Sequence, residues 1–350
     1  MDRMSEKKKN TFIDYLKGIA ILLVLVGHCV QYGSGAAFLE NGEYWNNIVM
    51  KVIYSFHMPL FVAVSGYLFW YSVKNHGMFS SIKSRIARLM PVCFTWALIL
   101  SLVDFTKGEF PGVKHIVYYF LTDFWFLWAI IFSTVCVALI EFVHNKFGGG
   151  AYAAVAVVLL MGAFILTPDM LWSHAYKFVA PYFIGGYYYA KKQKSWLKSN
   201  IVGGTSALLW AVLILFYSKD SYIYTTGLTV FRKDNIWNQL GIDAYRYLVG
   251  IVGVIAVIWI LKKLYAVIAS REESWVTSGR SMIEYMGRNS ITYYILSTYL
   301  FAWIMPKITK NFTFNIISIL VETFVVGVLC DVVGKIIKRF KHLSRWLIAN

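Results

Sequence analysis

Long apolar runs separated by short polar segments cover almost the whole chain. A helix needs about 20 mostly apolar residues to cross the hydrocarbon core of a bilayer, and ten segments approach that length. They are 13–33, 48–73, 89–103, 118–143, 150–167, 175–190, 200–217, 244–268, 283–304 and 313–335. The pattern predicts an all-α, polytopic membrane bundle of about ten transmembrane helices.

Composition excludes the other classes. Of the 350 residues, 58% are hydrophobic and 15% are charged, with a mean hydropathy of +0.57, whereas a soluble domain has about 25% charged residues. A soluble fold has too little interior for this much apolar surface, which excludes a soluble enzyme as well as a disordered chain. Since no linker divides the sequence, we expect one domain over 1–350, with a basic head (1–12) and a basic tail (336–350).

The net charge is +16, and its distribution suits a membrane protein rather than a nucleic-acid partner. The bases lie mostly between the apolar runs, while the segment 34–47 contains none. Ten crossings put both termini on one side, and the positive-inside rule makes that side cytoplasmic. The four cysteines fall in or at the edge of apolar stretches without a Cys-x-x-Cys pair, so we expect no metal site.

Ionisable residues interrupt the first apolar run. Lys17 and His28 are eleven residues apart, which places them on one helix face about 16 Å apart along the axis. Asp14 precedes Lys17 by one turn, and an ion pair with a snorkelling Lys17 is an alternative to a functional role. His28 has no interface to reach, and an imidazole can take a proton from a hydroxyl near neutral pH. We therefore consider His28 a candidate general base.

Two further candidates follow along the chain. His57, two residues before Pro59, is expected at a depth similar to that of His28, either in a polar pocket or as a hydrogen-bonded core histidine. Arg85 and Arg88 share one face of a helical turn near Pro91, where the third membrane helix is expected to begin. Paired guanidinium groups can clamp phosphate, although basic residues are common in cytoplasmic loops.

Other polar and aromatic positions support more than one interpretation. Glu322 lies mid-way along the last apolar run, where it could orient a histidine or pair with a base. Trp125 and Trp128 fit an interfacial aromatic belt, and they could equally line the mouth of a sugar-binding site.

Several of these motifs together resemble the acyltransferase 3 family, in its fucose 4-O-acetylase-like branch. The first is Asp14-x-x-Lys17-Gly-Ile-Ala followed by Gly27-His28. The others are Phe56-His57-Met-Pro-Leu-Phe61 with Ser65-Gly66, Arg85-x-x-Arg88, Trp125-Phe-Leu127 and Gly287-Arg-Asn289-Ser290 with Tyr294. The resemblance is dense over 12–91 and thin over 130–280. Many relatives carry a histidine shortly after the Asn-Ser pair, but this chain has none between Tyr294 and Tyr299, so no role is carried over to that position.

The resemblance implies transfer of an acyl group, usually acetyl, from cytoplasmic acyl-CoA to a hydroxyl of a bacterial surface glycan or its lipid-linked precursor, in the inner membrane. The implied donor-binding residues are Arg85, Arg88 and Lys17, and the implied catalytic residues are His28, His57 and Lys17. Acceptor contacts are assigned to Trp125, Trp128 and Ser65. Supporting roles are assigned to Asp14, Asn289, Ser290 and Glu322. No permanently bound cofactor is expected, and the oligomeric state is open.

Two mechanistic alternatives remain at this point: direct attack assisted by His28, and a covalent acyl-histidine. A glycan transporter or flippase is the alternative from another functional class, because intramembrane charges and ten helices also suit transport. The enzymatic reading predicts one continuous cavity from the cytoplasmic side, past Arg85, Arg88 and Lys17, to His28. We expect it to continue past His57 and to open outward beside Trp125 and Trp128.

Overall fold

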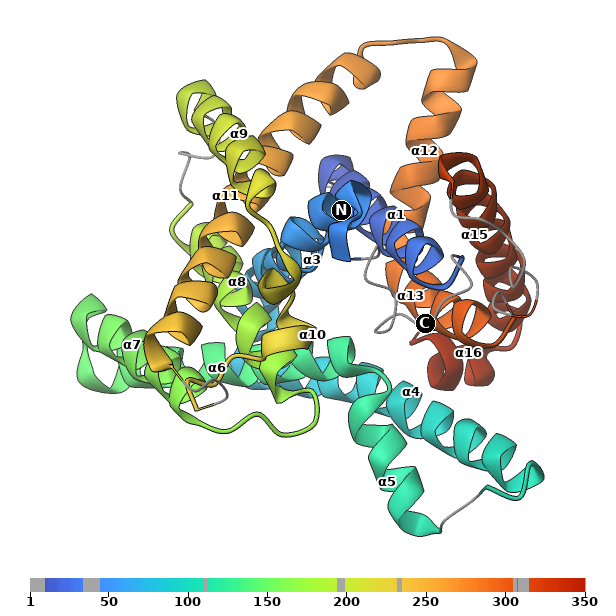
Figure 1. Cartoon of the computed structure of the whole chain (residues 1–350), viewed down its shortest axis with the longest axis horizontal. Helices are drawn as coiled ribbons and strands as arrows, with labels where there is room; N and C mark the ends of the chain where they lie inside the picture. The colour runs from blue at the N-terminus through green and yellow to red at the C-terminus, as the bar shows by residue number, and fades with distance from the viewer. Residues whose placement is uncertain are drawn as a thin grey trace, which may run out of the picture.

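The computed structural model of the chain describes residues 10–33, 45–109, 112–193, 199–231, 235–304, 307 and 315–349. Most of the basic head, most of the base-free segment 34–47 and the lysines at 194 and 198 lie outside these residues. Within the described ranges the secondary structure is helical, without a strand. The predicted all-α membrane bundle is confirmed (Figure 1).

Helices follow one another with short connections. They are α1 (Thr11–Gly33), α3 (Ile48–His76), α4 (Met78–Thr106), α5 (Val113–Thr122), α6 (Trp125–Phe147), α7 (Gly150–Leu166), α8 (Ser173–Lys191), α9 (Asn200–Leu215), η2 (Lys219–Ser221), α10 (Ile223–Thr226), α11 (Ile236–Ala269), α12 (Ser274–Arg288), α13 (Ser290–Tyr299), the π-helical η3 (Leu300–Ile304), α15 (Ile316–Lys338) and α16 (Lys341–Ile348).

Six described helices are long and apolar enough to cross a membrane: α1, α3, α4, α6, α11 and α15. The apolar helices α7 and α9 are shorter. Each of the ten expected segments contains a helix, but length and composition together qualify fewer than ten as spans. The predicted multi-pass character is therefore confirmed, while the number of crossings stays a prediction.

Three predicted boundaries differ from the structure. The segment 118–143 is divided between α5 and α6 at Phe124, whose backbone leaves the helical region. The segment 283–304 is divided at Asn289, whose amide donates to the Tyr285 carbonyl oxygen while its Oδ1 accepts from Lys338. The third segment begins eleven residues earlier than predicted, at Met78. Pro91 is therefore inside α4 and not at its start.

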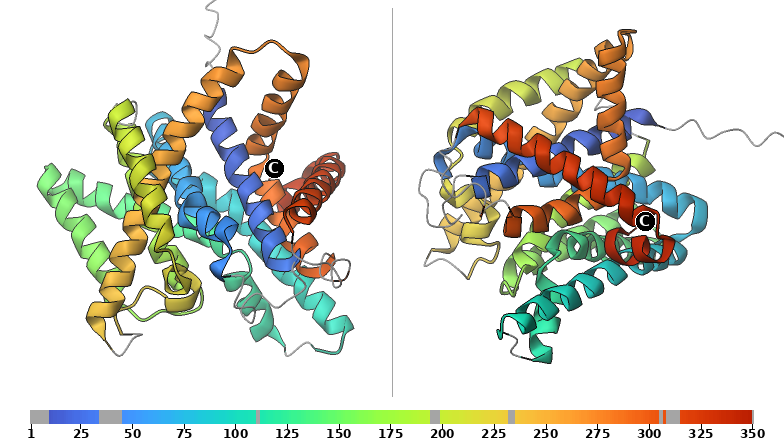
Figure 2. Two further views of the ribbon diagram at one scale, coloured as in Figure 1. Left: turned by 45° about the horizontal axis from the view of Figure 1, so that its top comes forward. Right: turned by 90° about the vertical axis from the view of Figure 1, so that its right-hand side faces the viewer.

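Helix α3 is central to the arrangement (Figures 1 and 2). It packs against α8 on one side and α1 on the other, and α1 in turn packs against α12 and α15. Helices α1 and α3 run in opposite directions, so α1 begins near the α3–α4 turn at Gly77. We call this the Gly77 end of the bundle. The opposite end, where the connection between α9 and α11 lies, is the Tyr222 end.

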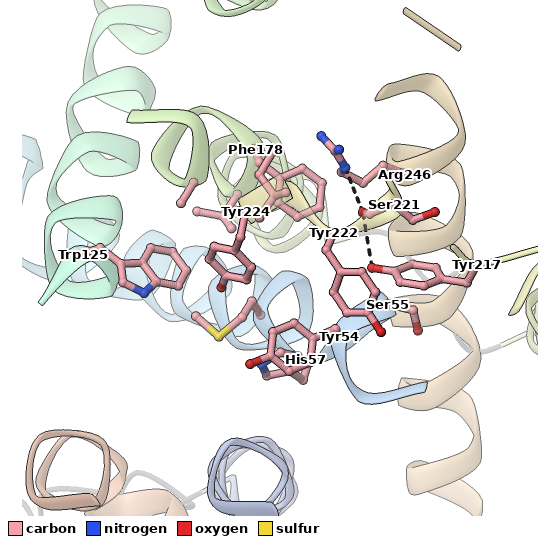
Figure 3. Close-up of a pocket in the computed structure, with 14 residues that line it drawn as sticks. Tyr54, Ser55, His57, Trp125, Phe178, Tyr217, Ser221, Tyr222, Tyr224 and Arg246 are labelled. Atoms are coloured by element: carbon pink, nitrogen blue, oxygen red, sulfur yellow. Dashed lines mark hydrogen bonds between the residues drawn. The ribbon is translucent and has the colours of Figure 1, made fainter. Parts of the chain in front are cut away.

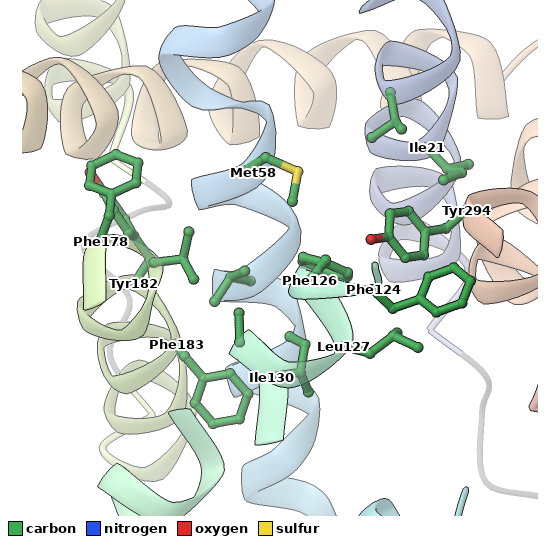
Figure 4. Packing of buried hydrophobic residues seen from close by; sticks show 14 of the residues in the cluster. Ile21, Met58, Phe124, Phe126, Leu127, Ile130, Phe178, Tyr182, Phe183 and Tyr294 are labelled. Atoms are coloured by element: carbon green, nitrogen blue, oxygen red, sulfur yellow. The ribbon is translucent and has the colours of Figure 1, made fainter. Parts of the chain in front are cut away.

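Glycines bring the central helices into close contact. A Cβ atom on Gly66 of α3 would lie 2.0 Å from the carbonyl oxygen of Phe183 in α8, and one on Gly287 of α12 would lie 1.8 Å from that of Asp14 in α1. Small residues at membrane helix crossings allow this approach of the two backbones. The crossings fix α1, α3, α8 and α12 relative to one another, and large side chains fill the neighbouring core (Figure 4).

Candidate active site

A cavity of about 320 Å³ opens among α1, α3, α4, α6 and α12 toward the Gly77 end. Four cationic side chains line it: Lys17, Arg85, Arg88 and Arg288. The remaining polar lining consists of serine hydroxyls, and the described lining includes no carboxylate. We call this the cation cavity. Four converging positive charges without a counter-charge in the wall are suited to an anion that carries several negative charges.

Arg85 is held in place at this cavity by α3, α6 and α8. Its Nη1 donates to Thr134 Oγ1 at 3.1 Å. Its guanidinium carbon lies 4.6 Å from the ring centre of Phe69 and 5.4 Å from that of Phe183. Aromatic faces attract a guanidinium group and restrict its rotation. The second charge of the predicted clamp is therefore oriented before any ligand binds.

Arg88 is oriented by the last helix. Its Nε donates to the carbonyl oxygen of Ala349 at 2.9 Å, and Trp96 Nε1 donates to that of Leu347 at 2.9 Å. Ile348 and Ala349 are buried beside them. Within the described part of the chain, the two Nη nitrogens of Arg88 have no hydrogen-bonding partner. They are the donors with which Arg88 can bind a ligand in the cavity.

Lys17 and Arg288 share a carboxylate. Asp14 Oδ1 lies 3.7 Å from Lys17 Nζ, and Asp14 Oδ2 lies 3.8 Å from Arg288 Nη1. Glu284 Oε2 lies 3.9 Å from the same Nη1. These distances are longer than hydrogen bonds, so the pairs neutralise charge without saturating the donors of Lys17 and Arg288. The expected Lys17–Asp14 pair is present, and Lys17 lines the cavity as well.

Arg288 is the site residue that the sequence analysis missed. It lies in the Gly287-Arg-Asn289-Ser290 motif, from which only Asn289 and Ser290 were selected. In the structure Ser290 lines the cation cavity, whereas Asn289 binds Lys338 of α15. The signal that could have found Arg288 is its place between the two motif residues that end one helix and begin the next.

His57 is on the other side of α3's middle turn from the cation cavity, in a small pocket of about 20 Å³ (Figure 3). Its Nδ1 lies 2.7 Å from the carbonyl oxygen of Ile53. A carbonyl oxygen can only accept, so Nδ1 carries the proton and Nε2 carries the lone pair. We call this the histidine pocket. Trp125 also lines it, as do Tyr54, Ser55, Met58, Ala175, Phe178, Val179, Tyr217, Ser221, Tyr222, Ile223, Tyr224 and Arg246.

The wall of the histidine pocket at the Tyr222 end is the connection 216–231, pinned by buried ion pairs. Arg246 of α11 donates to the carbonyl oxygens of Ser221 and Gly227 at 3.0 and 2.8 Å and pairs with Asp243 at 2.8 Å. Asp169 accepts from the backbone N–H groups of Leu228 and Thr229 at 2.9 and 3.2 Å.

Asp169 is therefore held in its charged form. Burial opposes its ionisation, but the two backbone N–H groups and Lys177, 3.2 Å away, keep the pKa of Asp169 below its ordinary value. The charged carboxylate fixes the connection onto the end of α8.

His28 lies apart from both lining sets. Its ring is 5.7 Å from that of Phe301 in an edge-on arrangement, and it is near enough to His57 for the charges of the two imidazoles to interact. The neighbouring Cys29 accepts from Thr323 Oγ1 at 3.3 Å. Glu322 is buried, and its carboxylate oxygens have no hydrogen-bonding partner among the described residues. It lies on the Cys29 side of α1, so the expected contact of Glu322 with a histidine or a base is not formed.

Two expected acceptor contacts lie elsewhere. Trp128 does not line the histidine pocket, because its Nε1 donates to the carbonyl oxygen of Phe120 at 2.7 Å and closes the α5–α6 turn. Ser65 lines the cation cavity instead, two turns along α3 from His57. Of the three residues proposed for the acceptor, only Trp125 is beside a histidine.

The expectation of one continuous cavity is wrong for this structure. The cation cavity and the histidine pocket have no lining residue in common. Phe61 and Phe126 face the cation cavity, while His57 and Trp125, which precede them on the same helices, face the histidine pocket. A layer of side chains therefore lies between the four cations and the imidazole.

Comparison with known proteins supports the sequence motifs. The profile of the family described as "Acyltransferase domain" matches residues 10–333. The nodulation protein NolL of Sinorhizobium fredii is 28% identical over 229 residues, 62% of this chain and 60% of that protein. NolL of Mesorhizobium japonicum is 24% identical over 208 residues, 58% of this chain and 51% of its own length. The chain thus matches little more than half the length of these relatives. No solved structure gives a significant match.

Proposed function

This chain belongs to the acyltransferase 3 family and is a membrane acyltransferase, and from this premise we propose that acyl-CoA is its donor. The proposed acceptor is a hydroxyl of a surface glycan or its lipid-linked precursor. The observation that carries the proposal is the cation cavity, where four cationic side chains converge and the described wall contains no carboxylate. CoA presents a diphosphate and a 3′-phosphate, an anion of matching charge.

The proposed orientation puts the Gly77 end in the cytoplasm of a bacterium, with the chain in the inner membrane. Lys and Arg in the short α3–α4 connection and in the tail support it through the positive-inside rule. Acyl-CoA is confined to the cytoplasm, so the open side of the cation cavity then faces the compartment that supplies the donor.

In the proposed mechanism, Arg88, Arg288 and Lys17 bind the phosphates, with Arg85 deeper in the cavity. The pantetheine arm extends along α1 across the distance of about 16 Å that separates Lys17 from His28. His28 takes the proton of the acceptor hydroxyl, whose oxygen attacks the thioester carbonyl carbon. The C–S bond then breaks, and the proton passes to the departing thiolate. His57, whose Nε2 can accept a hydrogen bond, positions the hydroxyl in the histidine pocket beside Trp125.

Titration of the purified protein with CoA tests the donor assignment. We expect saturable binding that weakens with salt, and that weakens further when CoA is replaced by dephospho-CoA. The matched control is Lys262→Ala, which removes an exposed base on α11 outside both lining sets. Equal binding of CoA by the Arg88→Ala variant and the unchanged protein would contradict the assignment. A transporter of glycans, the alternative from another class, would release no CoA thiol from acetyl-CoA under any condition.

A further inference from the structure

The boundary between the two cavities passes between adjacent positions on two helices. On α3, His57 lines the histidine pocket and Phe61, one turn later, lines the cation cavity. On α6, Trp125 lines the histidine pocket and Phe126 lines the cation cavity. Since both helices change sides at the same level, one layer of side chains divides the two spaces.

Aromatic rings make up this layer. The rings of Phe61 and Phe126 meet edge to face with their centres 5.3 Å apart, and those of Phe126 and Tyr294 meet at 5.4 Å. Phe126 is buried between α3 and α13, as Figure 4 shows. We call Phe61, Phe126 and Tyr294 the aromatic layer. It brings side chains from α3, α6 and α13 into contact at the point where the donor has to meet the histidines.

The composition of the layer suits a barrier to water. Two of its three members are phenylalanines, which give water no hydrogen-bonding partner. Rings that meet edge to face leave little space between them. Yet an aromatic side chain can open such a contact by rotation about its χ1 and χ2 bonds, without a change in the backbone. The cation cavity on one side and the polar tyrosine-lined pocket on the other remain intact when it does.

We propose that Phe61 and Phe126, backed by Tyr294, are specificity-determining residues that form a hydrophobic gate between the donor cavity and the acceptor pocket. The proposal rests on the proposed function. A thioester beside a basic imidazole is open to water as well as to alcohols. Water attack would form a C–O bond at the carbonyl carbon, break the C–S bond, and pass a proton to the thiolate, which yields a carboxylic acid and CoA. The closed gate excludes this reaction by keeping bulk water away from the thioester.

Trp125 gives the gate a connection to the acceptor side. It precedes Phe126 in α6, and the centres of the two rings are 6.0 Å apart. Trp125 also meets Trp172 and Tyr224 in the wall of the histidine pocket. A sugar that packs against Trp125 therefore acts on the residue next to the gate.

Thiol accessibility tests the gate without relying on catalysis. Val179 of α8 is buried and lines the histidine pocket, and Ser84 is exposed and lines the cation cavity. Val179→Cys and Ser84→Cys are made separately in a chain whose four cysteines are replaced by alanine. Sealed vesicles expose the Gly77 end to a membrane-impermeant maleimide. We expect Ser84→Cys to be labelled rapidly and Val179→Cys at least tenfold more slowly.

Opening the gate should connect the two spaces. Adding Phe126→Ala to the Val179→Cys chain is expected to raise its labelling rate from the Gly77 side at least tenfold. Phe61→Ala, which removes the opposing ring at a partly exposed position, should do the same if Phe126→Ala prevents folding. The control is Phe132→Ala, which removes a ring two turns along α6 that packs against Phe164 and Tyr176. It should leave the labelling rate unchanged.

The activity readout distinguishes the gate from the proposed function. With acetyl-CoA alone, the unchanged protein should release little thiol, and Phe126→Ala should release thiol and acetate in equal amounts at least tenfold faster. Labelling of Val179→Cys that is fast with an intact gate, or unaffected by both gate variants, would overturn the gate. Absence of CoA binding with the labelling results as expected would instead overturn the proposed donor and leave the gate intact.

Discussion

Arg88 and Ala349 are 261 positions apart in the chain, and Arg88 Nε donates to the Ala349 carbonyl oxygen at 2.9 Å. The contact makes α16 part of the wall that orients a cation of the candidate donor site. Trp96 makes the parallel contact to the Leu347 carbonyl oxygen. The last helix is thus coupled to a cavity that is otherwise built by α1, α3, α4, α6 and α12.

Detaching α16 should weaken donor binding. Ile348 is 1% exposed, so Ile348→Asp buries a carboxylate without a partner and is expected to release the helix. Arg88 then loses its orientation, and we expect CoA affinity to fall about tenfold, together with a lower Tm. Isothermal titration and thermal unfolding in detergent measure both effects. Lys341→Ala, at an exposed position of the same helix, is the control, and a change in Tm with unaltered CoA affinity would separate α16 from the site.

Arg288 is expected to contribute to donor binding as strongly as Arg88. A charge-assisted hydrogen bond to phosphate contributes roughly 1.5–3 kcal/mol, so Arg288→Ala should weaken CoA binding about tenfold or more. Arg288→Lys, which keeps the charge but loses the fork, should lie between the two. Titration at two salt concentrations measures this, and Lys262→Ala again serves as control. A variant that weakens only acceptor binding would contradict the assignment.

The two histidines should be required for turnover and dispensable for donor binding. His28→Ala removes the proposed base and is expected to abolish acyl transfer, while CoA affinity stays within about twofold of the unchanged protein. His57→Gln retains an acceptor for the hydroxyl and should keep more activity than His57→Ala. Single-turnover formation of the acylated glycan measures the reaction. Near-normal transfer by His28→Ala would reject its role as the base.

The α3–α8 crossing should not accept even one added methyl group. A Cβ on Gly66 would lie 2.0 Å from the Phe183 carbonyl oxygen, so Gly66→Ala must push the two backbones apart and lower Tm. Gly204 of α9 has open space around the position of a Cβ, and alanine is favoured over glycine in a helix by roughly 0.5–1 kcal/mol. Gly204→Ala is therefore the matched control, with an unchanged or higher Tm. Equal Tm values for both variants would argue against the close crossing.

The connection between α9 and α11 should loosen in acid. The pKa of Asp169 is below its ordinary value of 3.8 in the folded state, so the carboxylate stabilises the fold at pH values above that value. The stabilisation is lost as the pH falls through the folded pKa, in a range below about 4. Limited proteolysis of residues 216–231 as a function of pH measures the change. Asp169→Asn should give faster cleavage at neutral pH and a weaker acid dependence, and an identical acid profile in both proteins would refute the assignment.

Much of the fold could be read along the chain. Each membrane helix has to be apolar over most of its length, so the ten segments were visible without tertiary information. Lys17 and His28 were placed on one face by helical periodicity alone, and Arg85 and Arg88 by their spacing of three. What failed was local: the breaks at Phe124 and Asn289 depend on partners in distant helices. Asn289, for example, binds Lys338.

The sequence by itself determined the membrane class, the family and most of the cationic residues, because hydropathy and motif spacing are properties of consecutive residues. Only the tertiary structure decided that Arg288 joins the other three cations, since the glycine crossing of α1 and α12 brings it there. Only the tertiary structure likewise placed Ser65 with the cations, apart from Trp125, and divided the expected cavity in two. Whether two rings on different helices leave a passage or close it depends on how those helices pack, and packing is set by contacts between residues far apart in the chain.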